Sequence, residues 1–442
     1  MSQQKSADKP LQWWQLSLMG VACTIGTGYF LGTGVGIRVG GNAILIAFII
    51  AAFSTFVVFD FLAKMTAADP MDGSFCAYSK KAFGRWAGFS SGWVYWSSEL
   101  LIMGSQMAAL SLFTRLWFPN VPLWVFASIY AVLGIGIIAF GTKGFERVEH
   151  LFAVIKLAAI VIFVIIAVLS LMGIFGLGKH EPKWPLPLFP QGIKESWASM
   201  IYAFYSFGGI EVMGLLAIRL KDPKEAPKSG RVMISVLTAL YIVSLTLALS
   251  LAPWTSMEKK ESPFVSSLKG YGIVFVPHLF NVAFIIAGFS TMIASLFAVT
   301  KILVTLAKDG NAPSLFSRVS KGKRSMPYFA FGITTVMLAG SILLALLMPD
   351  SVYEYITTAA ALMLLYNWIF ILLTSGKLLQ LGTWGQTKRW IGVSFILMAV
   401  SGTLFHTTSR PGFYISIGFL ALIGSLTLFM LHKWKSSSDS HK

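Results

Sequence analysis

Charged residues are scarce in this chain of 442 residues. They make up 12% of the sequence, apolar residues make up 56%, and the mean hydropathy is +0.73. A soluble domain carries about 25% charged residues, and it has too little interior to hide this much apolar surface from water. The composition therefore excludes a soluble globular protein and predicts an integral membrane protein.

Cysteine and clustered histidine are scarce as well. The two cysteines, Cys23 and Cys76, cannot define a disulfide framework, and we expect both to be free thiols. The six histidines are scattered, and no two of them have a metal-binding spacing such as H-E-x-x-H. We therefore expect no metal, no other cofactor and no enzymatic activity.

Long apolar segments dominate the chain instead. A helix needs about 20 residues to cross a bilayer, and backbone polar groups in lipid must be satisfied within the helix itself. The sequence thus predicts an all-α integral membrane protein with about twelve transmembrane helices. The expected spans are residues 13–38, 42–68, 86–116, 122–141, 146–173, 193–219, 230–253, 272–308, 327–347, 352–375, 389–405 and 412–432.

Basic residues indicate how these spans are oriented. If the N-terminus is cytoplasmic, most of the 35 Lys and Arg residues fall on the cytoplasmic side, as the positive-inside rule requires. The net charge of +17 is then a topology signal, and no nucleic-acid partner is expected. We expect one transmembrane domain in the cell membrane at 13–432, with cytoplasmic tails at 1–12 and 433–442. The basic segment RVSKGKR (318–324) is also suited to contact anionic lipid.

Two spans contain residues that weaken a helix near the middle of the membrane. These residues are IGTG (25–28) in span 1 and SFGG (206–209) in span 6. Transporters build substrate sites from discontinuous helices at matching positions of two halves, because unwound backbone is tolerated only around a cavity. Free N–H groups suit a carboxylate and free carbonyls suit an ammonium. An α-amino acid carries both groups.

The glycines of span 1 also allow a second interpretation. A glycine recurs every four residues, at Gly28, Gly32, Gly36 and Gly40. This spacing is typical of the small-residue face of a helix that packs closely against another helix. We interpret this set as a packing ladder and assign Gly26 to the break. Gly34 fits neither pattern.

Five motifs, in order along the chain, match a known family. They are CTIGTGYFLGTG (23–34), ADPMDGSFCAYSKKAFGRWAGFSSGWVYW (68–96), HLFAVIKLAAI (150–160), YSFGGIEVMG (205–214) with KDPKEAPKS (221–229), and TKILVTLAKDGNAP (300–313). Together they resemble the amino acid transporter branch of the bacterial amino-acid permeases, in the amino acid–polyamine–organocation superfamily. The resemblance implies two inverted five-helix repeats, at about 13–173 and 193–375, with helices 1 and 6 broken. Two extra helices follow, at about 389–432.

The resemblance also implies which residues meet the substrate. Its carboxylate would bind the Thr27 hydroxyl and the backbone N–H groups of Ile25, Gly26, Thr27 and Gly28. Its ammonium would meet carbonyls around Thr24, Tyr205 and Gly208, with Gly209 in the same break. Tyr205 is similar in place to a gating aromatic of the superfamily, and Phe207 would line the side-chain pocket.

Ionisable residues within the spans are functional candidates, because lipid makes them costly. Lys156 lies well inside span 5, and related proton-coupled permeases have a lysine at this motif position, roughly where sodium-coupled relatives hold sodium. Glu211 follows the span 6 break and either takes part in proton coupling or hydrogen-bonds unwound backbone. We interpret Glu99 in span 3 as a contact between helices. If it faced the cavity, it would favour a cationic substrate or supply a second proton site.

Two charged residues near the cytoplasmic end of span 2 are expected to be structural. Asp60 and Lys64 are spaced i, i+4, which suits an ion pair along one helix. Members of the branch commonly have glutamate at the positions of Lys64 and Arg219. We therefore do not infer, from the resemblance, any ion pair at an inner gate of this protein.

These features predict a secondary transporter that imports a neutral amino acid, coupled to protons, by alternating access. Its expected partners are the amino acid, protons and membrane lipid. An exchanger of the same fold is the main alternative, followed by a permease-like nutrient sensor. The sequence makes no prediction of oligomeric state.

Overall fold

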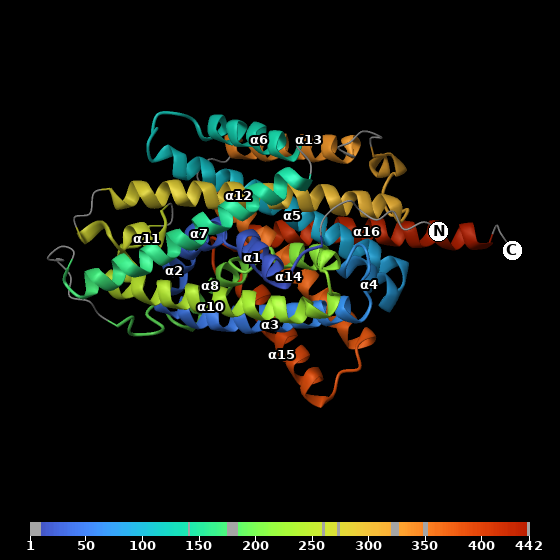
Figure 1. Cartoon of the computed structure of the whole chain (residues 1–442), viewed down its shortest axis with the longest axis horizontal. Coiled ribbons are helices and arrows are strands. Elements are labelled where there is room, and N and C mark those ends of the chain that lie inside the picture. Colours follow the sequence, from blue (N-terminus) through green and yellow to red (C-terminus); the bar gives the residue numbers. More distant parts are fainter. Residues whose placement is uncertain are drawn as a thin grey trace.

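Helices make up nearly all of the regular structure. The computed structural model describes residues 10–139, 142–174, 184–258, 261–271, 275–319, 327–347 and 352–439. Within these ranges the only pairing of extended backbone is an isolated bridge between Leu11 and Leu220. Figure 1 shows most of the long helices running along the longest axis of the molecule, with α4 and α11 at opposite ends. The predicted all-α membrane fold is confirmed.

Each expected span corresponds to a helix or to a broken pair of helices. The helices are α1 (Trp13–Thr24), α2 (Thr33–Gly40), α3 (Ile44–Ala68), α4 (Phe75–Phe83), α5 (Arg85–Arg115), α6 (Leu123–Ala139), α7 (Thr142–Leu171), α8 (Ile193–Tyr205), α9 (Ile210–Leu216), α10 (Ala226–Leu251), α11 (Pro263–Ser266), α12 (Val276–Lys308), α13 (Tyr328–Leu347), α14 (Val352–Leu378), α15 (Thr383–Gly402) and α16 (Arg410–Asp439). The division into two inverted repeats and two extra helices stays a prediction.

Length and apolarity qualify many of these helices to cross a bilayer. Among the described residues, seven helical stretches are long and apolar enough, and shorter apolar helices cover Leu123–Ile138 and Tyr328–Gly340. Helix α5 is long but carries polar residues along its buried faces, and it packs between α12 and α14. The most polar of the long helices therefore lies inside the bundle, where its polar groups find protein partners.

Two helices are interrupted, as predicted, at spans 1 and 6. Helix α1 ends at Thr24, and a π-helical turn, Gly28–Gly32, leads into α2. The first break is narrower than IGTG, because Thr27 already has helical dihedral angles. The second break is a turn over residues 206–209, where Gly209 has φ +108°, a conformation that favours glycine.

The glycine ladder packs α2 and the π-turn before it against α8. A Cβ added at Gly28 would lie 2.8 Å from Tyr205 Cδ1, and one added at Gly36 would lie 3.2 Å from Tyr202 Cβ. One added at Gly40 would collide with Ser199. The packing interpretation is thus confirmed for Gly28, Gly36 and Gly40, because small residues let the two backbones approach closely. Gly32 instead faces the Tyr353 hydroxyl of α14.

Gly34, which the sequence left unexplained, packs elsewhere. A Cβ at this position would lie 2.9 Å from the Glu261 carbonyl oxygen and 3.3 Å from that of Glu258. The glycine therefore lets α2 pass close to the backbone of the segment before α11.

The end of the expected N-terminal tail is docked on the bundle. Leu11 N–H donates to the Arg219 carbonyl at 2.8 Å, and Lys221 N–H donates to the Leu11 carbonyl at 2.9 Å. Residues 1–9 of this tail and most of the basic segment 318–324 lie outside the described residues. The chain before α1 is thus attached to the loop that follows α9.

Candidate functional site

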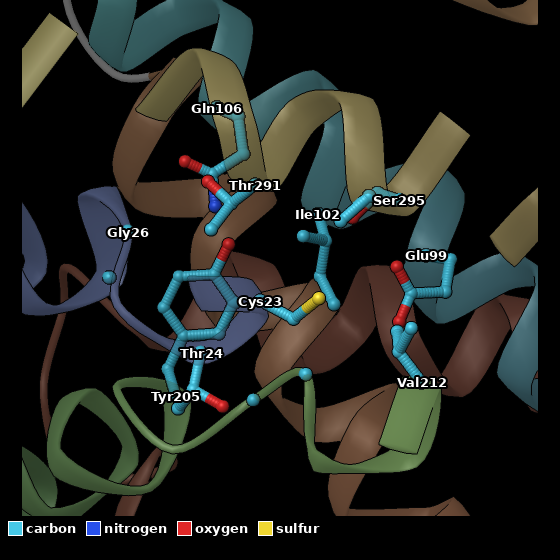
Figure 2. A pocket seen from close by; sticks show the side chains of 14 residues that line it. Cys23, Thr24, Gly26, Glu99, Ile102, Gln106, Tyr205, Val212, Thr291 and Ser295 are labelled. Carbon is cyan, nitrogen blue, oxygen red and sulfur yellow. The ribbon is translucent and has the colours of Figure 1, made fainter. Parts of the chain in front are cut away.

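A narrow cavity lies where the two broken helices meet. Its wall is formed by Cys23, Thr24, Gly26, Gly28, Glu99, Ile102, Gln106, Tyr205, Gly208, Gly209, Val212, Thr291, Ala294 and Ser295. Figure 2 shows that these residues come from both breaks and from α5 and α12. The cavity holds about 20 Å³, roughly the room for one water molecule. A larger ligand therefore requires the surrounding helices to move apart.

The two breaks are in direct contact. Ser206 Oγ donates to the Gly28 carbonyl at 3.0 Å, so the second break satisfies an acceptor of the first. A Cβ added at Gly209 would lie 2.6 Å from the Cys23 carbonyl oxygen. The backbone of the second break can approach α1 this closely only because residue 209 has no side chain.

The start of the second half of span 1 presents N–H groups toward α5. Thr27 N–H donates to Gln106 Oε1 at 3.3 Å, and the Thr27 hydroxyl donates to the same oxygen. Ile25 N–H, by contrast, completes the last turn of α1 by donating to the Val21 carbonyl at 3.0 Å. The amide oxygen of Gln106 thus occupies the kind of position that a ligand oxygen would take at the start of a helix.

The second break places Tyr205 in the cavity wall. Its hydroxyl is 2.5 Å from Ser105 Oγ on α5, and its carbonyl accepts from Gly208 N–H at 3.0 Å. Phe207 is fully buried outside the cavity wall, where its ring packs against Phe48 and Tyr241. The structure therefore places Tyr205 in the cavity wall and Phe207 behind it.

Lys156 reaches the first break from α7. Its ammonium donates to the Ala22 carbonyl in the last turn of α1, and it interacts electrostatically with Glu149 on its own helix. Ser290 Oγ on α12 lies 2.9 Å and 2.8 Å from the two carboxylate oxygens of Glu149. Both charged side chains are fully buried, so a polar cluster connects α1, α7 and α12.

Glu211 holds the second break from α9. Its Oε2 atom accepts from Gly209 N–H at 3.1 Å, and its Oε1 atom accepts from the Trp368 indole on α14. Both carboxylate oxygens are thus occupied, as expected if Glu211 hydrogen-bonds unwound backbone.

Glu99 lies in the cavity wall at the end away from the first break (Figure 2). Its side chain is 1% exposed, and its Oε1 atom has no hydrogen-bond partner within the described part of the chain. The carboxyl group is within hydrogen-bonding reach of Ser295 on α12, in line with our interpretation of Glu99 as a contact between helices, and the side chain also faces the cavity.

Most of the predicted binding residues lie in the cavity wall. These are Thr24, Gly26, Gly28, Tyr205, Gly208 and Gly209, whereas Ile25, Thr27 and Phe207 lie outside it.

Sequence reasoning missed several residues of the site, namely Ile102, Gln106, Thr291, Ser295 and the buried Glu149. A usable signal existed, because Glu99, Ile102 and Gln106 have the spacing of one helix face, as do Thr291 and Ser295. Polar residues repeated along one face of a long buried helix indicate a cavity.

Three smaller sequence features have structural explanations. Lys64 and Asp60 form the predicted i, i+4 ion pair. Both cysteines are free, as expected, and the structure shows that both are buried. The letters GFSSG (88–92) match the nucleophile motif G-x-S-x-G, but they lie inside α5, whereas that motif needs a strand-to-helix turn.

Comparisons with known proteins identify the family of the chain. Residues 15–429 match the model of a family described as "Amino acid permease". The chain is 53% identical over 439 residues to "Uncharacterized transporter YcgH" of Bacillus subtilis, with 98% of each chain covered. It is 31% identical over 445 residues to "Aromatic amino acid transport protein AroP" of Corynebacterium glutamicum, covering 93% of this chain and 94% of that one. Against AroP of Escherichia coli K12 it is 30% identical over 370 residues, covering 82% and 80%.

Substitutions at two glycines of span 1 are predicted to have different effects. In Gly26→Ala the new Cβ would lie 2.6 Å from Thr291 Cγ2 in the cavity wall, so we expect a folded protein that no amino acid stabilises. In Gly36→Ala it would lie 2.8 Å from Ile44 Cδ1, away from the cavity, so we expect a loss of about 1–3 kcal/mol of stability with ligand stabilisation retained. Thermal unfolding of the purified variants, with and without the amino acid that stabilises the unmodified protein, measures both effects.

Gly418→Ala on α16 is the control, because no atom lies within 4 Å of a Cβ at that position. We expect this variant to match the unmodified protein in melting temperature and in ligand response. Equal behaviour of the Gly26 and Gly36 variants would contradict the assignment of these glycines to different roles.

Proposed function

Because the chain belongs to the amino acid permease family, we propose that it imports a neutral amino acid together with protons by alternating access. The family and these relatives are transporters and not enzymes, and the long apolar helices make the chain a multi-pass protein of the cell membrane. The observation that carries the finer proposal is the cavity into which both helix breaks open. Binding at paired breaks is the means by which such transporters hold a substrate near the membrane centre.

The substrate carboxylate binds at the start of the second half of span 1. In an isolated helix the first N–H groups have no partner within the helix, and here Gln106 Oε1 accepts from Thr27. A carboxylate oxygen would replace this amide oxygen and also reach the N–H groups of Gly26 and Gly28, which lie in the cavity wall. The ammonium binds carbonyl oxygens of the two breaks, around Thr24 and Gly208.

The substrate side chain extends along the cavity between α5 and α9. The wall there is formed by Ile102 and Val212, with Tyr205 beside the breaks. No basic side chain lines the described cavity, so an acidic substrate would have no partner. Two of the similar proteins are named for aromatic amino acid transport, and this supports a neutral substrate.

Protons are coupled to transport through Lys156. Its buried ammonium is bonded to the Ala22 carbonyl at the end of α1, so losing its proton would change the hydrogen bonding of the first break. Glu211 contacts the second break, where its carboxylate accepts from Gly209 N–H. Gain or loss of a proton on Lys156 or Glu211 would therefore change hydrogen bonds to the backbone that holds the substrate. An ionisable group this deep in a membrane protein is a functional candidate by default.

The proposed orientation places both termini in the cytoplasm. The end of the bundle that contains α4 (Figure 1) also carries Lys80, Lys81 and Arg85. A concentration of basic residues at one end supports assigning that end to the cytoplasm.

Uptake by purified protein in liposomes tests the proposed function. With an inward proton gradient and no sodium, we expect one or more neutral amino acids to accumulate above the external concentration. Dissipating the gradient should reduce uptake to equilibration. Uptake that depends on sodium and ignores the proton gradient would contradict the coupling. Uptake only into vesicles preloaded with another amino acid would identify an exchanger, and stabilisation without flux would identify a sensor.

Replacing Lys156 is predicted to separate coupling from translocation. Lys156→Met keeps an unbranched side chain of similar length but removes the charge, so accumulation driven by the proton gradient should be lost. Exchange of labelled for unlabelled substrate needs no net proton movement and should persist. The matched control is Lys64→Met, which removes a half-exposed lysine at the ion pair with Asp60 and should behave like the unmodified protein. Full accumulation by Lys156→Met would exclude Lys156 from coupling.

A further inference from the structure

We propose that Glu99 determines substrate specificity by accepting a hydrogen bond from a donor group on the amino acid's side chain. The inference rests on the proposed function and makes it more specific. Among neutral amino acids, Glu99 would favour those whose side chains carry a hydroxyl, an amide or an indole N–H.

Glu99 lies where a substrate bound at the two breaks would place its side chain. It lies in the cavity wall on α5 and belongs to the end that Val212 and Ser295 also form (Figure 2). Gly26 and Tyr205 lie at the other end of this view, where the backbone of the two breaks is available to the α-amino and α-carboxyl groups. A substrate anchored at the breaks therefore directs its side chain toward Glu99.

Glu99 is buried, and one of its carboxyl oxygens lacks a hydrogen bond within the described residues. Its side chain is 1% exposed, yet Oε1 has no partner within the described residues, and burying an unpaired carboxylate oxygen is costly. Ser295 on α12 and Tyr95 on α5 are close enough to hydrogen-bond to the carboxyl group of Glu99, and the other nearby acid, Glu211, is already held by Gly209 and Trp368. Even so, Oε1 of Glu99 has no hydrogen-bond partner among the described residues, so this oxygen is an acceptor that a ligand can use.

The chemistry of the acceptor indicates what the partner must be. The oxygen of a carboxyl group that carries no proton only accepts hydrogen bonds, so it favours a donor and repels another acceptor. A site built around such a group also rejects an analogue that lacks the donor, because its own polar atom is then left unpaired. Tyrosine should consequently be preferred over phenylalanine, and threonine over valine.

Competitive uptake within matched pairs tests this inference. The pairs are tyrosine with phenylalanine, threonine with valine, and lysine with norleucine, which differ mainly in the side-chain donor. For each pair that enters the unmodified protein, we expect a preference of at least about tenfold for the donor. Glu99→Ala and the bulkier Glu99→Leu should reduce this preference to about unity, measured in uptake or in the stabilisation that each amino acid gives on thermal unfolding.

Ser98→Ala on the same helix is the control. Its hydroxyl donates to the Ala360 carbonyl and lies outside the cavity wall, so the preference should be unchanged. Thermal unfolding confirms that each variant is folded. A donor preference that survives both Glu99 substitutions, or no preference in the unmodified protein, would overturn the role of Glu99. Absence of uptake and of stabilisation for every amino acid would instead reject the proposed function. A preference confined to lysine would retain Glu99 and reject the neutral substrate.

Discussion

The structure depends on one constraint, that backbone groups freed from a helix inside a membrane must find partners within the protein. The two breaks provide partners for each other, since Ser206 Oγ donates to the Gly28 carbonyl. Neighbouring helices provide the rest. The hydroxyl of Tyr353 on α14 donates to the Thr27 carbonyl at 3.2 Å, and Lys156 on α7 donates to the Ala22 carbonyl. Each of these partners couples the breaks to a surrounding helix, so movement of those helices changes the site.

The helices and their breaks could be predicted from the sequence, because both follow from local composition. Apolar segments of sufficient length have few alternatives to a helix in lipid, and the paired clusters at IGTG and SFGG stand at matching positions along the chain. The spacing of the ladder glycines likewise predicted a packing face, which α8 occupies. The partner of Gly34 could not be predicted, because it lies far along the chain, in the segment before α11.

The site was only partly predictable, because part of its wall comes from segments that lie far apart in the sequence. Residues of the breaks themselves could be identified from their motifs, whereas the opposite wall comes from α5 and α12, whose contribution depends on tertiary packing. Glu99 illustrates the limit. Its position on a helix was evident, but which face of α5 meets the cavity was decided by contacts with α12 and α14. Phe207 shows the converse, because a residue within a break turned away from the cavity into an aromatic cluster.

The central claim is that the two breaks together hold an amino acid by its α-carboxyl and α-amino groups. An experimental structure of the protein with a transported amino acid bound tests this claim most directly. We predict ligand density between α1 and α9, with the carboxylate at the N–H groups of Gly26, Thr27 and Gly28 and with Gln106 displaced. Density for the ligand outside this cavity, or a carboxylate directed toward Glu99, would contradict it.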